Sequence, residues 1–153
     1  MGRINLGRVI LGGLVAGIVI NVFEGLLNGV LLSSQWGEVM KSLNRPATPS
    51  VKTIIALNVW GFAVGILMVW LYAAIRPRFG TGPKTAVCAG LIMWAACDAL
   101  ATSIPVFMHI YRVDLAVMAV AIEVVEMVAA SLAGAYFYRE GSAPQPLSSA
   151  ARA

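Results

Sequence analysis

The stretch "GRVILGGLVAGIVINVFEGLLNGVLL", residues 7–32, is long and apolar enough to cross a lipid bilayer as a single helix. It nevertheless carries one carboxylate, Glu24, and two amides, Asn21 and Asn28, where lipid would surround a spanning helix. At 100° per residue, these three side chains and Gly17 fall within an arc of about 60°. A polar stripe of this kind is expected to face other helices of the protein rather than lipid.

The composition of the whole chain is that of a membrane protein. Its 153 residues are 59% hydrophobic and 12% charged, with a mean hydropathy of +0.83. Soluble domains usually contain about 25% charged residues. The net charge of +4 does not indicate nucleic-acid binding, because the basic residues lie at the ends of apolar segments, where they orient helices and contact lipid headgroups.

Apolar segments of about 20 residues or more mark membrane-spanning helices. We expect four of them, at roughly residues 7–32, 52–75, 85–109 and 115–138. The predicted fold class is therefore all-α, an integral membrane antiparallel four-helix bundle. Residues 1–140 would form this single domain, and residues 141–153 a disordered cytoplasmic tail. The basic start imitates a signal peptide, but the apolar run continues to Leu32 without a clear cleavage site, which favours an uncleaved first span over cleavage.

The connector between the first two spans predicts a short amphipathic helix in the outer membrane interface. Trp36, Val39, Met40 and Leu43 share one face at helical spacing, and Ser50 can cap the second span. Two other arrangements stay open for this segment. It can be a surface loop whose Trp dips into the membrane, or a lid over the mouth of the bundle.

Lysine and arginine are unequally distributed between the two sides of the predicted bundle. If both termini are cytoplasmic, seven of them lie inside and four outside, which is the favoured bias. The inner group is Arg3, Arg8, Arg76, Arg78, Lys84, Arg139 and Arg152, and the outer group is Lys41, Arg45, Lys52 and Arg112.

The other three spans carry polar residues of their own at a similar depth. At about 1.5 Å per residue, the strongest polar residue of each span lies roughly 9–17 Å below the outer surface. We therefore expect one ligand-binding cluster in the outer half of the membrane. Its members are Glu24, Asp98, Glu123, Glu126, Asn21, Asn28, Asn58 and Thr102.

No Lys or Arg lies within the interior of a span to neutralise the four carboxylates of this cluster. An acidic residue near the centre of a spanning helix costs roughly 2.5–3.5 kcal/mol. The acids must then be protonated, hydrated or bound to a cation. The first hypothesis is a site that binds, and in one version transports, a proton, a cation or a cationic polar ligand.

Two other functional classes remain open. In a structural or accessory subunit, neutral carboxyls would hydrogen-bond to neighbouring amides and hold the helices together. In a metal-dependent membrane enzyme, Glu24, Asp98, Glu123 and Glu126 would supply oxygen ligands to a hard cation. The chain has no evident nucleophile–base pair, so the balance is against an enzyme. The only histidine, His109, lies about three turns from Asp98, and neither haem nor a nucleotide is expected.

Glycines four residues apart predict close helix packing, either within one chain or in a homo-oligomer. The pairs are Gly13 with Gly17, Gly25 with Gly29, and Gly61 with Gly65. The lipid bilayer is the other expected partner.

Two phrases of the chain, "INLGRVILGGLVAG" and "WLYAAIRPRFGTGPKTA", together with the Trp after the first span, resemble uncharacterised small four-helix membrane proteins of bacteria. The resemblance covers the first three spans and, more loosely, the fourth. It implies the fold, a bacterial origin and a multi-pass location in the inner (plasma) membrane, and it carries no activity.

Overall fold

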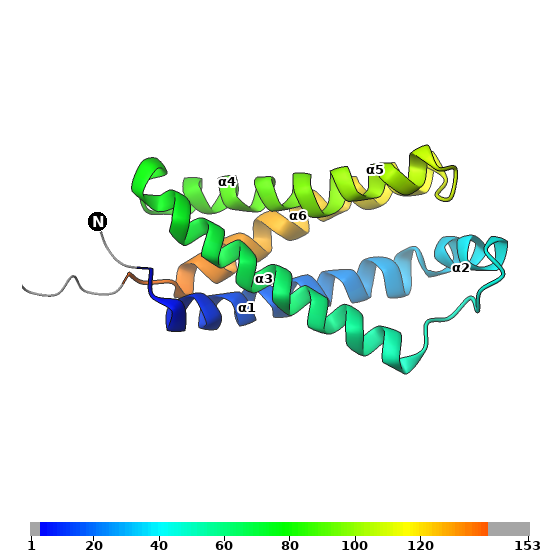
Figure 1. Cartoon of the computed structure of the whole chain (residues 1–153), viewed down its shortest axis with the longest axis horizontal. Helices are drawn as coiled ribbons and strands as arrows, with labels where there is room; N and C mark the ends of the chain where they lie inside the picture. The colour runs from blue at the N-terminus through cyan, green and yellow to red at the C-terminus, as the bar shows by residue number, and fades with distance from the viewer. Residues whose placement is uncertain (1–3, 141–153) are drawn as a thin grey trace, which may run out of the picture.

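The computed structural model describes residues 4–140, and every regular element in this range is a helix (Figure 1). Four helical stretches are long and apolar enough to cross a membrane, which confirms the predicted all-helical class with four such stretches. The predicted tail, residues 141–153, lies outside the described residues. The stretches are Leu6–Leu31, Val51–Phe79, Pro83–Phe107 and Val113–Phe137.

Two of these stretches are not uniform α-helices. The first is α1 followed by a π-helical turn, η1, and the third contains a second π-helical turn, η2, between α4 and α5. The second and fourth stretches are the continuous helices α3 and α6, and a short helix, α2, follows the first stretch. The bounds are α1 Leu6–Leu26, η1 Leu27–Leu31, α2 Ser33–Ser42, α3 Val51–Phe79, α4 Pro83–Trp94, η2 Ala95–Ala99, α5 Leu100–Phe107 and α6 Val113–Phe137.

Local sequence accounts for the helix ends. The Asn5 side chain accepts a hydrogen bond from the Arg8 amide and caps α1. The Ser50 hydroxyl accepts one from the Thr53 amide at 3.2 Å, so the predicted cap of the second span is confirmed. After α3 the chain reverses through Gly80, whose φ of +82° lies in the region that favours glycine.

Glycines bring the backbones of α1 and α3 into contact. A Cβ atom on Gly13 would lie 2.5 Å from the Cα of Ile66, and one on Gly65 would lie 2.5 Å from the Gly13 carbonyl oxygen. Two of the predicted glycine pairs therefore pack these helices together. In the third pair, a Cβ on Gly25 or Gly29 would meet nothing within 4 Å, so this pair makes no close contact within the chain.

The packing is tight toward the end of the molecule that holds Ile4 and Glu140, which we call the termini end. The buried core there includes side chains of 0% exposure from four helices: Ala16, Met68, Val69, Ala89 and Ala130. At the opposite end, which we call the α2 end, packing is looser. Residues 51–60 of α3 are all exposed, and neither η2 nor α5 contains a buried residue.

Helix α2 folds back over the α2 end, with its apolar face toward the other helices. Its Val39 is 4% exposed and belongs to a small second core with Leu27 and Leu115. The Trp36 ring packs edge-on against Tyr111, with 5.0 Å between ring centroids. The predicted amphipathic helix is thus present, and its apolar face packs on the side chains of η1 and the start of α6.

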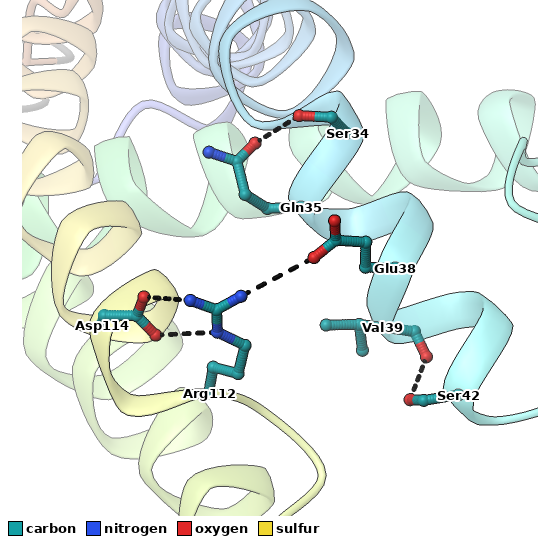
Figure 2. A network of polar contacts seen from close by, with 7 residues as sticks. All are labelled: Ser34, Gln35, Glu38, Val39, Ser42, Arg112 and Asp114. Atoms are coloured by element: carbon teal, nitrogen blue, oxygen red, sulfur yellow. Dashed lines mark hydrogen bonds and ion pairs between the residues drawn. The ribbon is translucent and has the colours of Figure 1, made fainter.

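An ion-pair network joins the exposed side of α2 to the start of α6 (Figure 2). The Arg112 guanidinium donates two hydrogen bonds to the Asp114 carboxylate, at 2.6 and 3.1 Å. Its remaining nitrogen lies 3.6 Å from a carboxylate oxygen of Glu38 on α2. These side chains are more than half exposed, so the network orients α2 but adds little stability.

Candidate functional site

Four carboxyl groups, from three of the four long stretches, lie near one another. Glu24 comes from α1, Asp98 from η2, and Glu123 and Glu126 from α6. Every pair among the four is close enough for the two charges to interact. We call these four residues the carboxyl cluster.

The carboxyl cluster is deepest at α6. Glu126 is 0% exposed and Glu123 is 9% exposed, whereas Glu24 and Asp98 are half-buried. Both carboxyl oxygens of Glu126 are buried without a hydrogen-bond partner among the described residues, as is one oxygen each of Glu123 and Asp98. A buried polar group left in this state costs about 1–3 kcal/mol, and more when it is charged. The residues around the cluster therefore do not supply the donors that its oxygens require.

No basic side chain of residues 4–140 compensates these acids. The ion pairs of the described region lie at its two ends and leave the carboxyl cluster out: Arg76 with Glu140, and Arg112 with Glu38 and Asp114. The four acids are also not arranged as a metal centre. Within the same residues, no group of three or more His, Cys, Asp or Glu side chains could hold a metal ion.

Glu24 is the member of the cluster that has a side-chain partner. The Asn28 amide donates a hydrogen bond to its carboxyl group. The amide oxygen of Asn28 in turn accepts one from the Trp36 indole N–H at 2.7 Å. A chain of two hydrogen bonds thus runs from α2 through η1 to the carboxyl cluster. Sequence reasoning had put Trp36 on the apolar face of α2 but had not connected it to Asn28, because this contact depends on how the chain turns between η1 and α2.

The two π-helical turns both carry residues of the site. Asn28 lies in η1, and Asp98 lies in η2. A π-helical turn accommodates one extra residue by shifting backbone hydrogen bonds from i→i+4 to i→i+5, and such turns are frequent at functional sites. Sequence reasoning missed both turns because it assumed 100° per residue throughout, and no residue type marks a π-helical turn.

The amides of Asn21 and Asn58 serve the contact between α1 and α3. The Asn21 amide donates to the backbone carbonyl of Asn58 at 3.2 Å, and a Cβ on Gly61 would lie 2.5 Å from the Asn21 side-chain oxygen. The Asn58 side chain is exposed and donates to the Ile54 carbonyl of its own helix at 2.8 Å. Thr102 is half-buried on α5, four residues after Asp98.

This arrangement can hold positive charge. Several mutually repelling carboxyls that lack donors are relieved when a proton or a cation arrives. The predicted site residues thus divide by position: the four acids and Asn28 lie together, whereas Asn21 and Asn58 join α1 to α3 by a hydrogen bond. The chain matches no protein-family model, no curated protein and no solved structure.

Proposed function

We propose that this chain is a multi-pass membrane protein whose four long stretches cross the bilayer in alternating directions, as an antiparallel bundle. The proposal rests on the length and apolar composition of the stretches and on the many large hydrophobic side chains exposed around the outside, such as Leu14, Trp60 and Val125. The distribution of Lys and Arg favours cytoplasmic termini. The resemblance noted above favours the inner membrane of a bacterium.

Within that membrane, the carboxyl cluster is proposed to bind a proton, a cation or a cationic polar ligand. One observation carries this proposal: Glu126 is 0% exposed, and neither of its carboxyl oxygens has a hydrogen-bond partner among the described residues. An isolated ionised carboxylate in an apolar interior is too costly to persist. Three further acids are within electrostatic reach, so their combined negative charge would attract the missing positive one.

Binding at the cluster is better supported than passage through the protein. Toward the termini end, the path from the cluster meets core side chains that are fully buried, among them Met68 and Ala130. At that end, the Arg76 guanidinium lies 5.5 Å from the ring centre of Tyr72 and 5.2 Å from that of Tyr138. The same guanidinium is paired with the Glu140 carboxylate at 3.4 Å, so this end of the molecule is closed by packed and ion-paired side chains. We therefore propose a binding site that a ligand reaches without passing the termini end.

The alternative function is a structural or accessory subunit, and one set of contacts favours it. The hydrogen bonds of Asn21 and Asn28 join elements in the way that polar residues hold membrane helices together. This alternative leaves Glu126 unexplained, because a residue that only holds helices together should have a partner. A metal-dependent enzyme is less well supported than either, since the described acids are not grouped as metal ligands.

Infrared difference spectroscopy tests the proposal on the full chain in lipid. In the ligand-free protein we expect a protonated-carboxyl band, because a proton is then the available positive charge. Adding a cation that binds should remove this band, as the carboxyl gives up its proton to bind the cation. Glu126→Gln should lose part of the band, whereas Glu140→Gln, at the far end of the molecule, should keep it. A wild-type spectrum that no cation and no change of pH alters would defeat the proposal.

A further inference from the structure

The carboxyl cluster is least covered on the side of Glu24 and Asp98. In Figure 1 the first part of α3 runs away from α5, and residues 51–60 of α3 are exposed on every face. On the same half of the molecule, η2 and α5 contain no buried residue. Glu24 and Asp98 are half-buried, whereas Glu123 and Glu126, on the helix behind them, are buried. The side of Glu24 and Asp98 is therefore the one from which a ligand would meet the fewest buried side chains.

Along the bundle axis, by contrast, helix α2 packs over the start of α6. Trp36 and Val39 of α2 pack over Tyr111 and Leu115, and Arg112 ties the exposed side of α2 to the start of α6 (Figure 2). A ligand that came along the bundle axis from the aqueous phase would have to displace this helix. A ligand that came sideways, between α1 and α5, would not.

The outer faces of the helices that flank the cluster are apolar. The exposed side chains on the flanking helices at this level are large and apolar, namely Val22, Leu26, Leu57, Trp60, Leu100 and Ile104. In a bilayer these residues face hydrocarbon, where a small hydrated inorganic ion has a very high free energy. An amphiphilic organic cation already lies in the membrane, with its charged head near the interface and its tail among the lipid chains.

A second copy of this chain does not fit the same place. It would bring apolar surface but no positive charge at this depth, because the Lys and Arg of the described residues lie at helix ends and in connectors. Three of the four acids have buried oxygens without a hydrogen-bond partner among the described residues, and a cationic ligand would supply the positive charge that a second copy lacks.

We infer that the ligand of the carboxyl cluster is an amphiphilic organic cation that enters sideways from the membrane between α1 and α5, with its charged head against Asp98, Glu24 and the buried pair Glu123 and Glu126. This inference rests on the proposed function and names its ligand class. The tail would stay along the exposed apolar surfaces of α1 and α5, so the protein binds one amphiphile per chain.

The test uses the full chain in nanodiscs of zwitterionic lipid. The probes are decyltrimethylammonium, tetramethylammonium, Na⁺, Mg²⁺ and a decyl amphiphile with an uncharged sugar head, and binding is followed by thermal unfolding and native mass spectrometry. Two matched variants accompany the wild type. Asp98→Asn alters the uncovered side of the cluster, and Asp114→Asn makes the same change at an exposed acid outside it.

We expect decyltrimethylammonium to bind one per chain and about tenfold or more tighter than tetramethylammonium, because its tail also contacts apolar surface. Asp98→Asn should weaken this binding by about tenfold, because it removes one negative charge that attracts the quaternary ammonium head, and Asp114→Asn should leave it unchanged. Three results would overturn the inference while the proposed function stands. Na⁺ or Mg²⁺ could bind more tightly than decyltrimethylammonium, or tetramethylammonium could bind as tightly as decyltrimethylammonium. The third result is that Asp98→Asn leaves the affinity for decyltrimethylammonium unchanged although another cation binds. If the sugar-headed amphiphile stabilises the protein as much as decyltrimethylammonium does, the inference is also overturned, because the effect then comes from partitioning of any decyl chain into the membrane. If none of these cations binds, the inference falls, and the proposed function falls with it only if the infrared spectrum also does not respond to pH.

Discussion

Replacing Glu126 by methionine should make the ligand-free protein more stable. The Glu126 side chain is 0% exposed, and its two carboxyl oxygens have no partner among the described residues. Most substitutions at such buried positions destabilise a protein. An increase would therefore be evidence that this carboxyl is kept for a purpose other than folding.

The magnitude follows from the unpaired oxygens. Leaving a buried polar group unsatisfied costs about 1–3 kcal/mol. Methionine is unbranched and close to glutamate in size, so it neither leaves a large cavity nor overfills the site. We expect Glu126→Met to raise the free energy of unfolding by about 1–3 kcal/mol, in line with the gains seen when buried charged groups are replaced by apolar ones. Glu126→Gln keeps an unsatisfied polar group and should change stability less.

The assay is reversible unfolding in mixed micelles, with ligand removed and the pH held constant. Glu38→Met serves as the control, because its side chain is 70% exposed and the same substitution there should stay within about 0.5 kcal/mol. If Glu126→Met and Glu126→Gln both lower the free energy of unfolding by more than about 1 kcal/mol, the carboxyl makes stabilising contacts. The interpretation of Glu126 as unpaired would then be refuted.

Two further substitutions test the packing and the link to α2. Gly65→Ala should destabilise the protein by about 1–3 kcal/mol, because the new Cβ would lie 2.5 Å from the Gly13 carbonyl oxygen. The control Gly25→Ala places its Cβ where nothing lies within 4 Å, so it should be neutral or stabilise by up to about 1 kcal/mol. If an unfolding assay finds equal effects for the two variants, the α1–α3 contact is contradicted. Trp36→Phe removes the 2.7 Å hydrogen bond to Asn28 but keeps an aromatic ring against Tyr111, so it should lower the free energy of unfolding by about 0.5–1.5 kcal/mol. The control Tyr111→Phe should leave the free energy of unfolding unchanged. An unchanged free energy of unfolding in Trp36→Phe would show that the hydrogen bond contributes nothing to stability.

Much of the fold could be predicted from the sequence because the relevant signals are local. Hydropathy gave the four long stretches, and Ser50 marked the start of α3. The predicted second span ends at about residue 75, where the apolar run ends, whereas helix α3 continues through Arg76 and Pro77 to Phe79. A proline within the last turn of a helix removes a hydrogen bond but need not end it there.

The candidate site was only partly accessible to the same reasoning. The acids could be grouped because depth along a spanning helix is a simple function of residue number. Asn58 was predicted to belong to the cluster because its depth along α3 does not reveal that this part of the helix is exposed and that its amide bonds to Ile54. The π-helical turns at Asn28 and Asp98 depend on backbone register, which has no residue signature.

The binding of a cation by the carboxyl cluster is tested most directly by stabilisation that depends on ligand concentration. Thermal unfolding of wild type and of Glu126→Gln would be measured in H⁺, Na⁺, Mg²⁺, Ca²⁺, Mn²⁺ and a quaternary ammonium series. Once the ligand exceeds its Kd, each tenfold increase should stabilise the wild type by about 1.4 kcal/mol. We predict that at least one cation does this for the wild type and that Glu126→Gln loses the effect. A wild type indifferent to every cation and to pH would contradict cation binding and leave the structural role as the explanation of the cluster.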